Sequence, residues 1–228
     1  MGNKAVWDEE YKKPKLITKS EKPPRDFLKF LQWIKKNKHL ELRSGLRVLD
    51  LGCGIGRNAY YLARVYGMEV FAWDFSPEAI RIAREHFSHE LVHYEERDIS
   101  KAFPLKDESI DLIIDSTSSN SLKEKERSFF VNEVARVLKK GGYLYLRTLA
   151  KEGDKNAKNL ITQFPSGEKD GYIHPVLGVR ERVFSGLDIR TLYEPKLRVV
   201  RMTRKTAYQK FGKQSYKRNY WNVYLTKE

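Results

Sequence analysis

Cysteine is almost absent from this chain: Cys53 is the only one among 228 residues. A lone cysteine cannot form a disulfide within the chain, and it excludes zinc sites built from several cysteines. The five histidines are dispersed and do not show the spacing of metal ligands, so we predict no metal site. This low cysteine usage is typical of a reducing compartment, and we expect a cytoplasmic protein.

Long hydrophobic runs are also missing. Mean hydropathy is −0.64, and no uncharged apolar stretch approaches the about 18 residues that cross a bilayer. The first 15 residues lack the apolar segment of a secretory signal, and Val6 stands where N-myristoylation needs Ser or Thr. We therefore expect no membrane partner. With 40% hydrophobic and 12% aromatic residues, the chain can still bury a core, which excludes disorder as its main state.

Negative charge is scarce, and the excess of positive charge is unevenly placed. The chain has 44 Lys and Arg against 30 Asp and Glu, a formal charge of +14. Residues 1–44 contain 12 basic and 6 acidic residues, and residues 190–228 contain 11 and 2, which leaves the middle at −1. This pattern has three interpretations: a solvated surface, a nucleic-acid contact, or a field that attracts a small anionic substrate.

Short apolar strands alternate with amphipathic helices through the first two thirds of the chain, which predicts an α/β fold with a mostly parallel sheet covered on both faces. The rhythm ends in a polar stretch at 150–183 and resumes in a short helix and two strands. The expected strands are 47–51, 69–74, 91–94, 110–115, 143–149, 197–204 and 220–225, and the expected helices are 25–37, 57–66, 76–87, 122–139 and 185–193.

These elements fit one domain over 1–228, since a single α/β sheet commonly needs this length. We expect an N-terminal arm (1–22) and helix within 1–44, a ligand-binding core at 45–149, an insertion or lid at 150–183, and a C-terminal helix and hairpin at 184–228.

The strongest local motif is VLDLGCGIGRN, residues 48–58. Gly52, Gly54 and Gly56 lie between a strand and a helix, where glycine permits a tight turn and a close approach of backbone to ligand. Asp74 ends the next strand, 22 residues after Gly52, near the offset at which an acid takes ribose hydroxyls. The combination predicts a nucleoside-binding site at the carboxyl edge of the sheet.

Asp50 indicates which nucleoside. The glycines follow G-x-G-x-G, not the dinucleotide pattern G-x-G-x-x-G, and Asp50 stands two residues before the first of them. A carboxylate there would repel a pyrophosphate and attract a cation. S-adenosylmethionine carries an ammonium and a sulfonium and no phosphate, so electrostatics favours it over NAD.

With these motifs, the chain resembles the class I, Rossmann-like S-adenosylmethionine-dependent methyltransferases, well over about residues 45–149 and loosely elsewhere. VLDLGCGIG, FAWDFSPEAI, ERDI, DLIIDSTSSN and VLKKGGYLYL are similar to successive motifs of that family. The resemblance implies a seven-stranded sheet with an antiparallel last strand. It also places Asp74 on the ribose, Phe75 beside the adenine and Asp98 on the adenine amino group. The residues expected to bind the cofactor are Tyr11, Asp50, Gly52, Gly54, Gly56, Asn58, Asp74, Phe75, Ser76, Asp98, Ile99 and Asp115.

A narrower similarity concerns GCGIGRNAYYLA and VFAWD, which resemble small-molecule methyltransferases of the tellurite-resistance and thiopurine type. That resemblance implies a soft or small anionic acceptor. The matched residues lie on the cofactor side, so they bear little on the acceptor itself.

No general base is obvious from the sequence. The fourth strand ends Asp115-Ser-Thr-Ser and lacks the Asp/Asn-Pro-Pro-Tyr/Phe tetrapeptide of base-amine methyltransferases. Because active sites lie at the carboxyl ends of parallel strands, Asp115, Ser116 and Asn120 are expected to face the acceptor. His174, in the insertion, is the candidate for proton transfer, with an ordinary loop histidine as the alternative.

Three functions remain open at this point. The first is methyl transfer to a small acceptor under a lid formed by the arm, with Trp7 and Tyr11, and the insertion, giving S-adenosylhomocysteine as product. The second is methylation of RNA, since Lys and Arg alternate with Tyr208, Phe211 and Tyr216 in the basic segment 204–218. The third is a module that binds the cofactor without catalysis.

Overall fold

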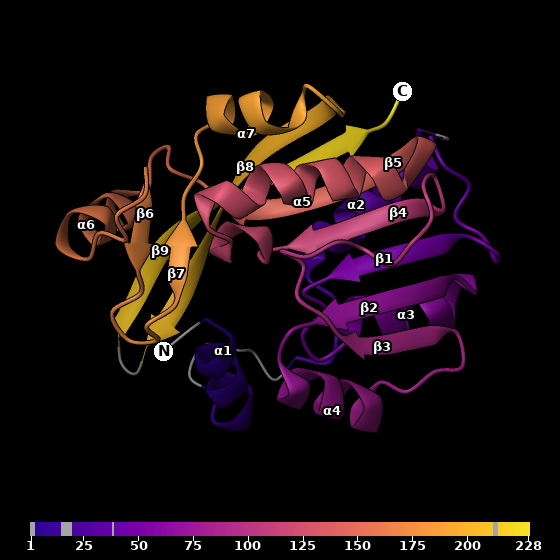
Figure 1. The fold of residues 1–228 in the computed structure, drawn as a ribbon, viewed down its shortest axis with the longest axis horizontal. Coiled ribbons are helices and arrows are strands. Elements are labelled where there is room, and N and C mark those ends of the chain that lie inside the picture. Colours follow the sequence, from indigo (N-terminus) through magenta and orange to yellow (C-terminus); the bar gives the residue numbers. More distant parts are fainter. Residues whose placement is uncertain (1–2, 15–19, 38, 212–213) are drawn as a thin grey trace.

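The computed structural model describes residues 3–14, 20–37, 39–211 and 214–228. Its centre is a seven-stranded sheet in the order β3-β2-β1-β4-β5-β9-β8 (Figure 1). The first five strands are parallel, β9 runs antiparallel between β5 and β8, and β8 is antiparallel to β9. The predicted α/β, Rossmann-like fold with an antiparallel last strand is therefore confirmed. The strands are β1 (Arg47–Leu51), β2 (Glu69–Asp74), β3 (Val92–Glu96), β4 (Ile110–Ser116), β5 (Leu138–Leu149), β8 (Arg198–Phe211) and β9 (Gln214–Thr226).

Helices cover both faces because apolar side chains stand on both sides of the parallel strands. On one face, Phe30 and Ile34 of α2 and Leu62 of α3 pack with Tyr145 in a core that also includes α4. On the other face, Val134 of α5 and side chains of α7 form the second core. The helices of these two layers are α2 (Arg25–Lys36), α3 (Arg57–Tyr66), α4 (Pro77–His86), α5 (Glu124–Val137) and α7 (Gly186–Tyr193). No helix among the described residues is both long and apolar enough to cross a membrane.

The N-terminal arm is more regular than expected. It contains a ten-residue helix, α1 (Asn3–Lys12), which lies beside α4 in Figure 1. The sequence did not predict this helix because the helix has little amphipathic character and no acidic residue in its first turn. Residues 1–2 and 15–19 of the predicted arm lie outside the described residues.

The insertion at 150–183 was predicted to be irregular, and that is wrong. It contains α6 (Lys155–Gln163) and a small separate sheet of β6 (Gly171–Ile173) and β7 (Arg180–Arg182). Asp154 caps α6 by accepting the N–H of Ala157 at 2.8 Å. The buried ring of Tyr172 packs with Tyr220 of β9. The insertion is thus a folded unit anchored on the C-terminal hairpin.

The basic segment 204–218 was expected to connect the last two strands, and its described residues instead lengthen those strands. β8 and β9 stay paired from Arg198 and Thr226 as far as Phe211 and Gln214, so the segment extends the hairpin beyond the sheet (Figure 1). The side chain of Phe211 lies outside the described residues, and Tyr208 is 69% exposed. Alternation of Thr, Ala and Tyr with basic residues is compatible with a solvated two-stranded ribbon.

One further boundary differs from the prediction. The helix expected over 122–139 is preceded by a short 3₁₀ turn, η1 (Ser119–Ser121), and ends at Val137. β5 follows at once from Leu138, so the two glycines at 141 and 142 lie within a strand rather than after a helix.

Candidate functional site

The glycine motif forms the loop from β1 to α3. Gly52, Gly54 and Gly56 have φ values of 68°, 56° and 87°, a backbone region that side chains with a Cβ seldom adopt. A Cβ on Gly52 would lie 2.1 Å from Oγ of Ser118, and one on Gly56 would lie 2.4 Å from the hydroxyl of Tyr94. Glycine is therefore required by conformation and by space. The predicted tight turn at the carboxyl end of β1 is present.

Asp74, at the end of β2, ties this loop to the next helix. Its Oδ2 accepts the N–H of Gly54 at 3.0 Å, and its Oδ1 accepts the N–H of Ser76 at 2.9 Å. The hydroxyl of Ser76 in turn caps α4 by accepting the N–H of Ala79. Burial raises the pKa of Asp74 to about 6, against the lowering effect of these hydrogen bonds. Asp74 keeps free lone pairs, which suits the predicted contact with ribose hydroxyls.

Two other buried carboxyl groups lie near Asp74. Burial, followed by the charges of Asp74 and Asp115, raises the pKa of Asp50 to about 7. Burial likewise raises the pKa of Asp115 to about 6, although its Oδ1 accepts the N–H groups of Ser118 and Ser119 at 3.1 and 3.2 Å. All three carboxyl groups are at most 5% exposed. Such a concentration of raised pKa values marks a functional site more often than a structural one.

Buried polar atoms without hydrogen-bond partners indicate which kind of ligand suits the site around the glycine loop. Within the described part of the chain, Oδ2 of Asp50, Oδ2 of Asp115, Oδ1 of Asn58 and Oδ1 of Asn120 are buried without a hydrogen-bond partner. Such groups are costly unless a ligand or water supplies a donor. These four acceptors, two of which belong to carboxyl groups, together with the buried carboxyl group of Asp74 favour a cationic ligand rich in donors. S-adenosylmethionine, with its ammonium, sulfonium and ribose hydroxyls, fits this chemistry, and a pyrophosphate does not.

Helix α1 lies against this cluster. The hydroxyl of Tyr11 lies 2.8 Å from the position that a Cβ on Gly54 would take. Asp8 accepts the hydroxyl of Ser76 at 2.8 Å and the N–H of Glu78 at 3.0 Å, so α1 supplies an extra cap to α4. Lys4 pairs with Glu96 at the end of β3. The arm thus lies next to Gly54 and Ser76, and its predicted role as part of a lid over the cofactor stays a prediction.

The remaining predicted cofactor residues lie on the loops after β2 and β3. Phe75 is half-buried directly after Asp74. Asp98 is exposed, and its Oδ1 accepts the N–H of Ser100 at 2.9 Å, while Ile99 packs against the second core. Asp74 accepts the N–H of Ser76, and its charge acts on Asp50, whereas the proposed contact of Asp98 with the adenine stays a prediction.

The loop after β4 carries the predicted acceptor side of the site. Asp115 and Asn120 are 1% exposed, and Ser116 is half-buried. Thr117, between Ser116 and Ser118, has φ of 65° and donates its N–H to the carbonyl of Arg147 at 2.7 Å. A left-handed threonine is strained, and strain of this kind concentrates at functional loops. The roles of Asp115 and Ser116 in transfer remain proposals.

His174 does not have the environment of a general base. Its Nδ1 accepts the N–H groups of Val176 and Leu177 at 3.3 Å each, which occupies the lone pair of a neutral imidazole. Burial, with help from the charge of Arg218, lowers its pKa to about 4. The geometry favours the alternative reading, a histidine that organises the turn after β6.

Two hollows lie away from the glycine loop, around the start of α6. One cavity of about 460 Å³ is lined by Lys151, Lys155 and Lys158 together with the loop before α6 and Ser185. A neighbouring cavity of about 300 Å³ includes Lys217 of β9.

Over the described ranges, no group of three or more His, Cys, Asp or Glu side chains is placed to hold a metal ion.

Replacing Asp74 by alanine should weaken binding of S-adenosylmethionine by about 1.5–3 kcal/mol, the range for a hydrogen bond to a charged group. Calorimetric titration measures the change. Asp74→Asn, which retains an acceptor for the N–H of Gly54, should lose less. Equal affinity in the wild type and Asp74→Ala would refute the ribose assignment.

Binding of the cofactor should release protons near pH 6. Asp50, Asp74 and Asp115 have pKa values of about 7, 6 and 6, so the unliganded site is partly protonated there. A bound cation favours the carboxylates, so protons leave and affinity rises as the pH increases from 5.5 to 7.5. Calorimetry in buffers of different ionisation enthalpy counts these protons, and proton uptake would contradict the account.

Comparison with known proteins agrees with this site. Residues 48–142 match the family model described as "Methyltransferase domain". The 2-methyl-6-phytyl-1,4-hydroquinone methyltransferase of Synechocystis sp. is 27% identical over 155 residues, covering 67% of this chain and 48% of that protein. The tRNA N(3)-cytidine methyltransferase METTL2 of Danio rerio is 29% identical over 110 residues, covering 44% of this chain and 31% of that protein. The matches span less than half the length of these two relatives.

Solved structures show the same fold. A structure of an S-adenosylmethionine-dependent methyltransferase from Methanosarcina mazei superposes with a TM-score of 0.70 at 24% identity, covering 85% of this chain and 96% of that one. A similar enzyme from Anabaena variabilis gives 0.70 at 15% identity, covering 99% and 93%. Taken with the glycine loop, the buried carboxyl groups and the strand order, these matches support the resemblance of residues 48–142 to the class I S-adenosylmethionine-dependent methyltransferase superfamily, and the chain has the same fold.

Proposed function

We propose that this protein transfers a methyl group from S-adenosylmethionine to a small acceptor that carries negative charge. The observation that supports a small acceptor best is the closure over the carboxyl edge of the sheet. Asn3 of α1 donates from Nδ2 to the carbonyl of Ser121 at 3.1 Å, and its Oδ1 accepts the N–H of Arg180 in β7 at 3.1 Å. The arm and the insertion therefore meet above the loop after β4, an enclosure that suits a small molecule and excludes water.

In this proposal the cofactor is held by Asp50, by Asp74 and by the glycine loop, and it supplies a methyl group on a positively charged sulfur. The chain contributes alignment of the acceptor and exclusion of water. Alignment of two reactants lowers a barrier by about 7–11 kcal/mol, so an acceptor that is already nucleophilic needs no strong base. Asp115, with a pKa of about 6 and an unpaired Oδ2, is the side chain best placed to orient the acceptor or take its proton.

Formation of S-adenosylhomocysteine tests this function. The protein is incubated with S-adenosylmethionine and with separate panels of small carboxylates, phosphate esters and thiols, and the product is quantified by mass spectrometry. We expect turnover with at least one anionic or thiol acceptor and a large loss of turnover in Asp115→Asn. Methylation of RNA alone would overturn the small-acceptor proposal, and tight binding without turnover on any acceptor would favour the non-catalytic module.

RNA is the second candidate, and one feature of the surface favours it. Lys151, Lys155, Lys158 and Lys217 line two adjoining hollows beside the basic hairpin. Two curated relatives are tRNA methyltransferases, one of them from Danio rerio. Contact with several phosphates predicts affinity that falls steeply with salt. A filter-binding assay between 50 and 200 mM salt would show little RNA binding, and no steep dependence, if the small acceptor is correct.

A further inference from the structure

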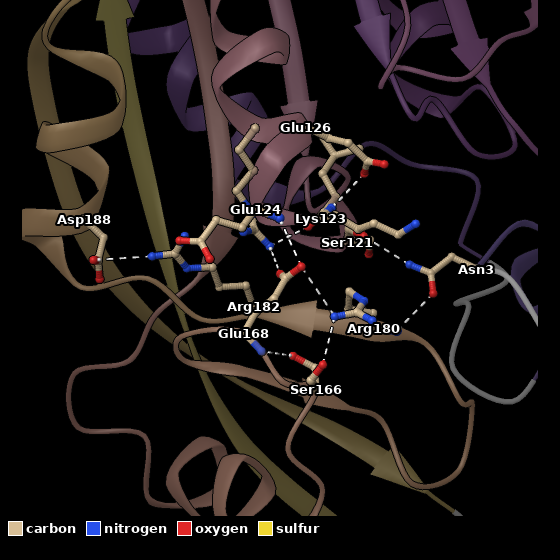
Figure 2. Close-up of polar contacts among 12 residues, drawn as sticks. Asn3, Ser121, Lys123, Glu124, Glu126, Ser166, Glu168, Arg180, Arg182 and Asp188 are labelled. Atoms are coloured by element: carbon tan, nitrogen blue, oxygen red, sulfur yellow. Dashed lines mark hydrogen bonds and ion pairs between the residues drawn. The ribbon is translucent and has the colours of Figure 1, made fainter.

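The carboxylate of Glu168, in the insertion, lies near Arg180 and near Glu124 at the N-terminus of α5 (Figure 2). Its Oε1 accepts the N–H of Glu124, the first residue of that 14-residue helix, at 3.2 Å. Arg127 approaches Oε2 at 3.5 Å, and Arg180 approaches Oε1 at 3.5 Å. A helix N-terminus and two guanidinium groups around one carboxylate form the arrangement that binds oxyanions in general.

The arginines around Glu168 are not saturated by it. Arg127 is 3% exposed, and both its Nε and its Nη1 are buried without a hydrogen-bond partner in the described part of the molecule. Its Nη2 donates to the carbonyl of Leu122. Arg182, 8% exposed, also has an unpaired Nε. A buried guanidinium N–H without an acceptor lowers the stability of the fold. A bound oxyanion would offer these N–H groups more acceptor oxygens than the carboxylate of Glu168 does at 3.5 Å.

Positive charge exceeds negative charge in this cluster. The positive groups are Arg127, Arg180, Arg182 and Lys169, and the negative groups are Glu168, Asp188 and Glu124, whose charge acts on Arg127. Asp188 lies 3.5 Å from Arg182 and 3.1 Å from Lys169. Arg127 and Arg182 also pack against one aromatic ring, since their guanidinium carbons lie 5.7 and 4.8 Å from the ring centre of Phe184. The cluster therefore has a standing capacity for one more negative group.

The cluster adjoins the proposed transfer site. Leu122, whose carbonyl Arg127 contacts, follows η1, and Ser119 at the start of η1 donates its N–H to Asp115. Burial raises the pKa of Tyr193, the charge of Asp115 adds to that rise, and the charge of Arg127 opposes it, so Tyr193 lies within reach of both groups. Glu168 itself is 19% exposed, which leaves its position open to exchange.

We propose that the N-terminus of α5, with Arg127 and Arg180, is an oxyanion subsite for the methyl acceptor, and that Glu168 occupies it as an internal substitute until the acceptor arrives. The ligand it would take is a carboxylate or phosphate group of a small molecule. This inference rests on the proposed function, because it assigns the acceptor's negative charge to a place.

Glu168→Gln tests the subsite without touching the arginines. In the full-length protein saturated with S-adenosylhomocysteine, inorganic phosphate and malonate are titrated separately by calorimetry. Removing the competing charge should raise affinity for at least one of them by about tenfold. Tighter phosphate alone assigns a phosphate-bearing acceptor, and tighter malonate alone assigns a carboxylate. Glu194→Gln, an exposed glutamate paired with Arg190, makes the same change of net charge and should leave affinity unchanged.

The gain should disappear when an arginine is also removed. Arg127→Gln in the Glu168→Gln protein should return anion affinity to the wild-type level or below. If that variant does not fold, Arg180→Gln, at a 25% exposed position, makes the same test. Unchanged anion affinity in Glu168→Gln would overturn the subsite. Retained binding of S-adenosylhomocysteine in the same sample shows that such a failure does not concern the proposed methyltransferase function.

Discussion

The Asp50→Asn protein should bind S-adenosylmethionine at least about 100-fold more weakly than the wild type and yet be more stable without ligand. Leaving a buried charge of the cofactor without its partner costs about 3–5 kcal/mol, which accounts for the lost affinity. The gain in stability has a separate origin. Asp50 is 1% exposed, and one of its oxygens has no partner among the described residues.

The raised pKa of Asp50 explains why Asp50→Asn should be more stable than the wild type. Burial and neighbouring carboxyl groups raise the pKa of Asp50 to about 7 from 3.8. A raised carboxyl pKa means that the folded state binds more protons than the unfolded state between those two values. Stability contributed by this group is therefore lost as the pH rises from about 4 through 7. The Asp50→Asn protein does not lose this stability, so its free energy of unfolding should exceed that of the wild type little at pH 4 and most at pH 8.

Thermal unfolding at several pH values measures both effects. At pH 8 we expect the melting temperature of unliganded Asp50→Asn to exceed that of the wild type by about 2–8 °C, equivalent to about 1–2 kcal/mol for a chain of this size. Added S-adenosylmethionine should reverse the order. Asp107→Asn, at a carboxylate that is 74% exposed, is the matched control and should change neither quantity much. A variant that is destabilised and still binds would assign Asp50 a purely structural role.

Gly54→Val should fold and bind no cofactor within the range of calorimetry, a loss greater than about 1000-fold. Gly54 has φ of 56°, and its Cβ would lie 2.8 Å from the hydroxyl of Tyr11. A β-branched residue in this region costs about 1–2 kcal/mol in backbone strain alone. The larger effect comes from the added methyl groups, which fill space between the loop and α1 and displace the N–H that Asp74 accepts.

Gly141→Val separates backbone strain from loss of the ligand space. Gly141 has φ of 73°, but no atom lies within 4 Å of the position of its Cβ. That variant should show the same order of destabilisation by thermal unfolding and bind the cofactor normally. If Gly54→Val is folded and binds as well as Gly141→Val, the glycine loop is not where the cofactor lies.

The sequence predicted the fold around the glycine loop well because its signals are local. Gly52, Gly54 and Gly56 follow β1, Asp74 ends β2, and the parallel pairing of β1 with β2 brings these strand ends together. Short apolar runs predicted the seven strands, and apolar residues at three- and four-residue spacing predicted the main helices, for the same reason. The motif reading of Asp50 agrees with the buried, acceptor-rich cluster in the structure.

The rest depends on contacts between residues far apart in the chain. Asp8 caps α4 across 70 positions, and Glu168 contacts Arg127 across 41, and neither pairing leaves a periodic trace in the sequence. His174 was singled out for its chemistry, but its neighbours Val176 and Leu177 use the very lone pair that catalysis would need. The +9 charge of 190–228 left three interpretations open, and the pairing of β8 with β9, which places much of this charge on an extended hairpin, could not be predicted from it.

Comparative titration of three ligands that contain adenosine tests the central claim, that the buried carboxyl cluster at the glycine loop selects S-adenosylmethionine. S-adenosylmethionine, S-adenosylhomocysteine and NAD are titrated by calorimetry into the wild-type protein at pH 8. We predict one-to-one binding of the first two and no measurable binding of NAD, whose pyrophosphate would face Asp50. Binding of NAD with comparable affinity, or no binding of S-adenosylmethionine, would contradict the account.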